Sequence, residues 1–236
     1  MVGEGDLVPQ TFSKALKSLG IVPRVEMRIA SPGGDCFVGS ALFDIATNSG
    51  IKFDVRVDGI AASMGSYLAM IGERITMGAS AQMMLHDPAA NGSGGVDALE
   101  RTAKLLSAIR DRMARIYAAR SGQPEDAVRR MMEAETWMDA AAAVRAGFAD
   151  AIGEDLRLAA AASKFDLSGY RNPPAPTTPK TMGELSEQFW AGKGKSPAPL
   201  AVGDEDVSDL IPAPKSHAEV WANFNRQGRG RMGGVK

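Results

Sequence analysis

Hydrophobic and polar residues alternate in the first 60 positions with two periods, one typical of helices and one typical of strands. Val25, Met27 and Ile29 occupy every second position, so an extended chain would place them on one face. Helical and extended segments follow one another twice, which predicts a parallel α/β sheet. The expected elements are a helix over 11–19, a strand over 24–30, a helix over 38–48 and a strand over 53–57.

A long amphipathic helix is the main element predicted in the second half of the chain. Apolar residues recur at steps of three and four from position 96 to position 120, which indicates a helix of about 25 residues. We expect its apolar stripe to pack in the core. The other expected elements are short strands over 75–77 and 83–85, and helices over 67–71, 124–133 and 140–146, the last with Asp139 as N-cap.

The composition changes after Leu156, where an alanine run and eight prolines follow. Such a segment cannot bury much apolar surface, so we predict a linker-like, largely irregular tail. Two short amphipathic pieces, 182–191 and 217–225, interrupt it and could dock on the body or on a partner. The predicted organisation is therefore one domain over 1–156 and a Pro-rich tail over 157–236.

Composition and charge narrow the range of functions. Apolar residues make up 44% of the 236 residues, enough for a sizeable core, and the net charge of −1 gives no reason to expect a nucleic-acid partner. Cys36 is the single cysteine, which excludes an internal disulfide and favours a cytoplasmic location. The sequence shows neither a signal-like start nor a run of about 18 apolar residues, so we expect no export and no membrane contact.

Three short motifs in the first 90 residues suggest acyl-transfer chemistry. Ser63 follows a predicted strand and opens a helix, and His86 comes 23 positions later at the end of another strand. Gly33-Gly34 forms a turn after the first strand. A serine, a histidine and exposed backbone amides are the nucleophile, the general base and the oxyanion donors of a serine hydrolase. Such a site requires no metal and no cofactor.

Each of these residues also has an ordinary structural interpretation. Ser63 could cap a helix, His86 could be a core or surface histidine, and Gly33-Gly34 could be a plain tight turn. Cys36 is expected to be a small buried residue, because no other histidine in the body could activate it. The combination favours catalysis, and His86 is then the base, since the other histidine lies in the tail.

Five motifs in order resemble the ClpP-type serine peptidases. Within that family, the chain is most similar to the ClpP-like head-maturation proteases of phages and prophages. The resemblance covers residues 11–154 and implies a ClpP/crotonase-like fold of stacked ββα units with a long amphipathic helix. The motifs are SPGGD with Gly39 (31–39), DGIAASMG (58–65), MLHDP (84–88), AETWM (134–138) and AGFAD (146–150).

The resemblance assigns roles to four positions. Ser63 matches the nucleophile and His86 the general base, while Gly34 and Met64 match the two positions whose backbone N–H groups form the oxyanion hole. Gly34 precedes Ser63 by 29 positions, as the family pattern implies.

The acid of the triad departs from the family pattern. The family places an aspartate two residues before an aromatic residue, and here that position is Glu135, before Trp137. A glutamate is one methylene longer, so its carboxylate could still reach the imidazole. We expect Glu135 to be the acid, with Asp139 in reserve, and Asp35 and Asp87 to cap turns.

The resemblance also implies partners and location. Substrates would be capsid or scaffolding proteins, in the host cytoplasm or in the phage prohead. The chain would form a homo-oligomeric ring, with the long helix contributing contacts between rings. Only about ten residues precede the first predicted helix, so docking to an ATP-driven unfoldase is not expected, although a truncated N-terminus would explain the short segment equally well.

Two other functions stay open at this stage. A crotonase-type acyl-CoA enzyme shares the fold and the paired oxyanion amides but needs no Ser63 and His86 together, and would bind CoA. A catalytically inactive assembly module would use the tail as its binding surface and would tolerate Ser63→Ala.

Overall fold

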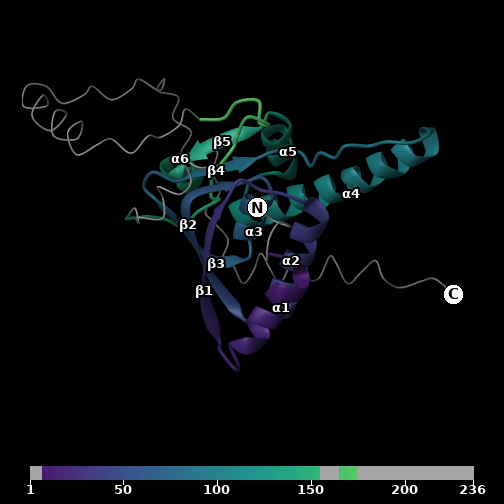
Figure 1. Ribbon diagram of the computed structural model, residues 1–236. Helices are drawn as coiled ribbons and strands as arrows, with labels where there is room; N and C mark the ends of the chain where they lie inside the picture. Colours follow the sequence, from purple (N-terminus) through teal and green to yellow (C-terminus); the bar gives the residue numbers. More distant parts are fainter. Residues whose placement is uncertain (1–6, 155–164, 175–236) are drawn as a thin grey trace, which may run out of the picture. The chain divides into compact units, whose positions relative to one another are not determined.

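The computed structural model describes residues 7–154 and 165–174. Within these residues the strands form one six-stranded sheet of order β5-β4-β2-β3-β6, with β1 paired to β2 off this path (Figure 1). The strands are β1 (Arg24–Ser31), β2 (Lys52–Ala62), β3 (Gly72–Gly78), β4 (Gln82–Leu85), β5 (Thr136–Asp139) and β6 (Ala151–Gly153). The α/β fold class expected from the sequence is therefore confirmed.

The longest strand, β2, organises the sheet. Its first half pairs in parallel with β1 and β3, and its last residues, Ile60 to Ala62, pair in parallel with β4. Every β2 residue from Val57 onward is buried. Because both faces are covered there, the alternation stops, and the sequence pattern detects only the part of β2 over 53–57.

One short strand, β5, makes the sheet mixed rather than parallel throughout as predicted, whereas β6 pairs in parallel with β3. The hydrophobic pattern predicts neither β5 nor β6, which have four and three residues. Segments this short carry too little periodicity to be recognised. Strand β5 runs antiparallel to β4, with Met84 opposite Trp137, and so brings the 134–138 motif beside the segment that ends in His86.

Six helices in the described part agree closely with the predicted segments. They are α1 (Pro9–Ser18), α2 (Cys36–Asn48), α3 (Met64–Ala69), α4 (Val96–Ser121), α5 (Glu125–Glu133) and α6 (Ala140–Arg145). Asp35 caps α2 by accepting hydrogen bonds from the N–H groups of Phe37 and Val38. Asp139 caps α6 through the N–H of Ala142, as predicted.

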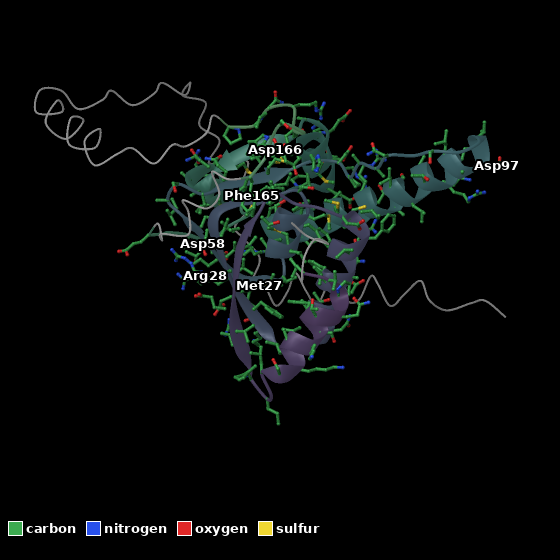
Figure 2. All side chains as sticks on the ribbon, in the orientation of Figure 1. Met27, Arg28, Asp58, Asp97, Phe165 and Asp166 are labelled. Carbon is green, nitrogen blue, oxygen red and sulfur yellow. The ribbon has the colours of Figure 1, made fainter. Side chains whose placement is uncertain are left out.

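The long helix α4 is buried along only part of its length. Its buried residues are Met113, Ala114, Ile116 and Tyr117, all in the C-terminal half. Val96 and Leu99 near its start are 71% and 45% exposed. Figure 1 shows this first half extending away from the sheet, and Figure 2 labels Asp97 at its far end. The prediction that the whole apolar stripe packs in the core is therefore wrong for the first half of the helix.

Most of the predicted tail, including the amphipathic pieces at 182–191 and 217–225, lies outside the described residues. The exception is residues 165–174, whose contacts are given below. In the part of the chain that the structure describes, no helix is both long enough and apolar enough to cross a membrane.

Candidate active site

The turn between β2 and α3 presents Ser63. This residue has a φ of 54° and a ψ of −122°, a backbone conformation that residues with a side chain rarely adopt. Gly33 packs directly against it: a Cβ built at Gly33 would lie 2.6 Å from the Ser63 Cβ and 3.1 Å from its Oγ. The Gly-Gly turn after β1 thus supports the serine at a distance that only glycine permits.

His86 follows β4 and lies beside Ser63. Because β4 pairs in parallel with the end of β2, the residues that follow both strands meet at the same edge of the sheet. The His86 Nε2 atom is 2.7 Å from the Ser63 Oγ, which is hydrogen-bonding distance. Burial lowers the pKa of His86, so the imidazole is neutral near pH 7 and can accept the serine proton.

Backbone amides border the same site. Met64 is the first residue of α3, where N–H groups have no partner within the helix and the helix dipole favours negative charge. Gly34 has a φ of 144° and lies in the turn after β1. Both residues line a cavity of about 330 Å³ together with Ser63 and His86. The structure thus brings together four of the predicted site residues.

Packing against α2 also holds this turn in place. The Met64 side chain is buried, and a Cβ built at Gly39 of α2 would lie 2.3 Å from its terminal methyl carbon. A side chain at position 39 would therefore force the end of the Met64 side chain to move.

Two polar residues that the sequence analysis misses also anchor the turn. Ser66 is fully buried, and its Oγ lies 2.7 Å from the carbonyl oxygen of Ser63 and 2.6 Å from that of Met84. The Tyr117 hydroxyl lies 2.8 Å from the Ser66 Oγ. This network joins α3, β4 and α4 around the nucleophile. No sequence signal marks it, because its partners are 18 and 51 positions apart.

Glu135 lies between α5 and β5 and is 5% exposed, with a φ of 54°. Its Oε1 accepts hydrogen bonds from the N–H of Asn172, at 2.9 Å, and from the Trp137 indole, at 3.3 Å. Burial raises its pKa, but these hydrogen bonds outweigh that effect and the net shift is downward, so the carboxylate is ionised. Its charge is the main influence that raises the pKa of His86, in opposition to burial.

The hydrogen bonds and the ion pair of the Glu135 carboxylate go to groups other than the imidazole. Between these two described residues there is no hydrogen bond, and the contacts of Glu135 go to Asn172, Trp137 and Arg171 instead. Glu135 therefore acts on His86 through its charge in this structure, unlike a triad acid that is hydrogen-bonded to its histidine.

The other acidic candidates are placed differently. Asp139 is exposed and engaged in capping α6. Asp87 has a buried Oδ1 with no hydrogen-bond partner among the described residues, and burial raises its pKa. The prediction that Asp87 caps a turn is wrong for this oxygen, whereas Asp35 does cap a helix. Cys36 is buried, as expected, and burial raises the pKa of its thiol.

A comparison with protein families then assigns the fold to a known group. The model of the Clp protease family matches residues 15–155, more than half of the chain. The chain belongs to the Clp protease family. It is 37% identical over 135 residues to the ATP-dependent Clp protease proteolytic subunit of Chara vulgaris, a match that covers 55% of this chain and 60% of that protein.

A second member of the Clp protease family shows a similar relationship. The ATP-dependent Clp protease proteolytic subunit of Pleurastrum terricola is 32% identical over 130 residues, which cover 54% of this chain and 66% of that protein. The chain thus matches less than two thirds of the length of each of these two relatives.

Residues 165–173, which we call the strap, lie beyond the part that matches the Clp protease family and contact the site. The Tyr170 hydroxyl donates a hydrogen bond to the carbonyl oxygen of Pro32. Its ring meets the rings of His86 and Trp137 edge-on, with centroids 5.4 Å and 5.7 Å apart. The composition after Leu156 predicts a linker-like tail and does not indicate these contacts of the strap.

Apolar side chains at the start of the strap explain why it packs on the body. Phe165 and Leu167 pack with Trp137 against a small buried cluster made by Ile60, Ala62 and Met84. Figure 2 labels Phe165 and its neighbour Asp166. Three apolar residues within six positions, Phe165, Leu167 and Tyr170, are the signal that was available in the sequence. The surrounding alanines and prolines obscured it.

Metal binding can be considered for the same described residues. Across 7–154 and 165–174, no three His, Cys, Asp or Glu side chains come together as a group that could hold a metal ion.

Proposed function

We propose that this protein is a serine endopeptidase with Ser63 as nucleophile and His86 as general base. The observation that carries the proposal is the 2.7 Å distance between Ser63 Oγ and His86 Nε2, at a turn bordered by backbone amides. Membership of the Clp protease family supports peptide bonds as the target.

In the first half of the reaction, Ser63 forms a bond with the substrate. His86 Nε2 takes the hydroxyl proton as the Oγ attacks the peptide carbonyl carbon. The carbonyl oxygen becomes an oxyanion, and the N–H groups of Gly34 and Met64 stabilise it. The C–N bond then breaks, and His86 returns the proton to the leaving amine, which leaves an acyl ester on Ser63.

In the second half, water releases the acyl group. His86 takes a proton from a water molecule, whose oxygen attacks the ester carbonyl, and the same two amides hold the second oxyanion. The bond to Ser63 breaks, and the proton passes from His86 to the serine oxygen. The products are a carboxylic acid, an amine and the free enzyme.

Glu135 has an electrostatic role in this scheme. When His86 gains a proton, its positive charge develops near the buried carboxylate of Glu135, which favours the charged form. Burial opposes that charge, so the carboxylate compensates for part of the cost of protonating the imidazole. We propose Glu135 rather than Asp139 as the acid, because Asp139 is occupied as a helix cap.

The assembly and the natural substrate are further parts of the proposal. The exposed apolar residues in the first half of α4, among them Val96, Leu99 and Leu105, would pack against other subunits of a homo-oligomeric ring. The sequence resemblance to phage head-maturation proteases supports capsid or scaffolding protein as the substrate. Cleavage would then take place in the host cytoplasm or inside the prohead.

A cleavage assay tests the peptidase proposal. A mixture of defined peptides is incubated with the wild-type chain, with Ser63→Ala and with His86→Ala, and the products are identified by mass spectrometry. We expect cleavage by the wild type alone, in the size-separated fraction that contains the assembled ring. Equal cleavage by wild type and Ser63→Ala would refute the proposal, as would no cleavage in any assembly state.

A further inference from the structure

The strap forms one wall of the cavity beside the nucleophile. Gly169 and Tyr170 line the cavity of about 330 Å³ together with Ser63, Gly34 and Met64. This volume is near the lower end of the roughly 300–1,000 Å³ range of ligand pockets. The cavity can therefore hold a short piece of a peptide next to Ser63, and the strap limits its size.

Hydrogen bonds attach the strap to two parts of the body. On one side, the Tyr170 hydroxyl bonds to the carbonyl of Pro32, in the turn that carries Gly34. On the other side, the Arg171 guanidinium donates to the carbonyl of Glu133 at 2.7 Å, and the N–H of Asn172 donates to Glu135. Tyr170 is thus held beside His86 by its own hydroxyl and by the two residues that follow it.

The lining of the cavity is largely apolar. Besides Tyr170, its apolar members include Pro32, Met64, Pro88, Ala89 and Met113, and the strap adds one charged residue, Asp166. Such a surface selects by size and shape, since apolar groups make no directional bonds. The Tyr170 ring is the largest side chain that the strap contributes to this lining, so its volume sets how much room is left.

We propose that Tyr170 is a specificity-determining residue, which restricts the substrate residue next to the scissile bond to small or medium apolar side chains. The proposal rests on the proposed peptidase function and extends it to a segment outside the family match. The strap acts as a wall rather than a plug, because the cavity it lines still reaches Ser63 and both oxyanion positions.

Substitutions in the strap test this proposal in both directions. Tyr170→Ala enlarges the cavity, and Tyr170→Phe keeps the ring while removing the hydroxyl, with its bond to Pro32 and its interaction with Ser63. Gly169→Leu narrows the cavity; a Cβ at Gly169 would meet no atom within 4 Å, so this variant is expected to fold. Ile21→Ala serves as a matched control, because Ile21 is 106% exposed and precedes β1.

The measurement is kcat/KM for peptides that differ only in the residue before the scissile bond, from alanine to leucine to phenylalanine. Tyr170→Ala should raise the phenylalanine-to-alanine ratio by about 10-fold or more, the usual scale of discrimination in apolar pockets. Gly169→Leu should lower it. Tyr170→Phe and Ile21→Ala should keep the wild-type ratio, and thermal unfolding of each variant reports whether it is folded.

Two outcomes would overturn the proposal while leaving the peptidase function intact. One is an active wild type whose preference is the same in Tyr170→Ala and Gly169→Leu. The other is a uniform rise in rate for all peptides in Tyr170→Ala, which would make the strap a cover rather than a selective wall. A wild type that cleaves no peptide and is not labelled by a fluorophosphonate would instead refute the peptidase function itself.

Discussion

The two sides of His86 are built in different ways. On the side of Nε2, Ser63 is held by parallel pairing of β2 and β4 and by the buried Ser66 network, all within the part of the chain that matches the Clp protease family. On the side of the acid, Glu135 is held by the strap, which lies beyond that match, and makes no hydrogen bond to the imidazole among the described contacts.

The two sides of His86 therefore contribute to the reaction in different ways. The pair of Ser63 and His86 has the geometry for proton transfer by itself, whereas Glu135 changes the pKa of His86 through its charge. Substitutions of Ser63 or His86 should therefore abolish the reaction. Substitutions of Glu135 should have a milder effect on its rate and pH dependence.

The largest effect is expected at the nucleophile. Ser63→Ala removes the attacking oxygen, and we expect kcat to fall by at least about 10⁴-fold, as in other serine hydrolases. Steady-state peptide cleavage measures this. His86→Ala should lose a similar amount, and the double variant should be little worse than either single variant, because the two residues act as a unit. If the double variant instead lost the sum of the two single losses in activation free energy, Ser63 and His86 would act independently, which would contradict the proposed proton transfer between them.

A smaller but still large loss is expected from Gly33→Ala. The new Cβ would lie 2.6 Å from the Ser63 Cβ, at a φ of +113° that disfavours any side chain. Ser63 must then shift, and a displacement on the order of 1 Å can reduce kcat/KM by about 10²-fold. The control is Gly20→Ala, which also has a positive φ, of +68°, but meets no atom within 4 Å. Equal activity of the two variants would show that the close packing against Ser63 has no effect.

The variant Glu135→Gln tests whether the charge of Glu135 acts on His86. The wild-type pH profile of kcat/KM should have its acid limb below pH 6.5, because burial lowers the pKa of His86 and only the neutral imidazole accepts a proton. Glu135 raises that pKa, so removing its charge should move the limb to still lower pH.

The same variant also bounds the contribution of Glu135 to the rate. The loss in kcat should be smaller than the roughly 10⁴-fold seen where a triad acid is hydrogen-bonded to its histidine. Asp139→Asn provides the matched control and should leave the acid limb in place. A limb that moves upward in Glu135→Gln, or moves only in Asp139→Asn, would contradict the assignment.

The mildest effect is expected from Ser66→Ala, which concerns stability. Losing this hydroxyl removes its hydrogen bonds with the Met84 carbonyl and the Tyr117 hydroxyl, each of which typically contributes about 0.5–1.5 kcal/mol to the free energy of unfolding. The Met84 carbonyl keeps the bond from the Ser63 N–H, and the Tyr117 hydroxyl keeps the Ser63 carbonyl, so the cost stays moderate. Denaturant titration measures the change. Ser18→Ala, which removes an exposed hydroxyl bonded to its own helix, is the control. An unchanged free energy in Ser66→Ala would mean that the network contributes nothing.

The difference between the Ser63 side and the Glu135 side of His86 also explains which features the sequence could predict. The serine, the histidine and the glycine turn lie in short motifs whose strands are adjacent in the sheet, so their meeting follows from local patterns and a parallel topology. The strap could not be foreseen, because its contacts with Pro32 and Glu135 join positions 138 and 37 apart and no periodicity encodes them. The exposure of the first half of α4 could not be predicted for a similar reason, since an apolar stripe indicates a helix but not the surface that the helix packs against.

The central claim, that His86 activates Ser63, is tested most directly by the rate of fluorophosphonate labelling. Intact-mass spectrometry follows adduct formation at pH 7 in wild type, Ser63→Ala, His86→Ala and Glu135→Gln. We predict one adduct per wild-type chain, located on Ser63 by peptide mapping, no adduct in Ser63→Ala or His86→Ala, and slower labelling in Glu135→Gln. Labelling of His86→Ala at the wild-type rate, or no adduct on the wild type in any assembly state, would contradict the account.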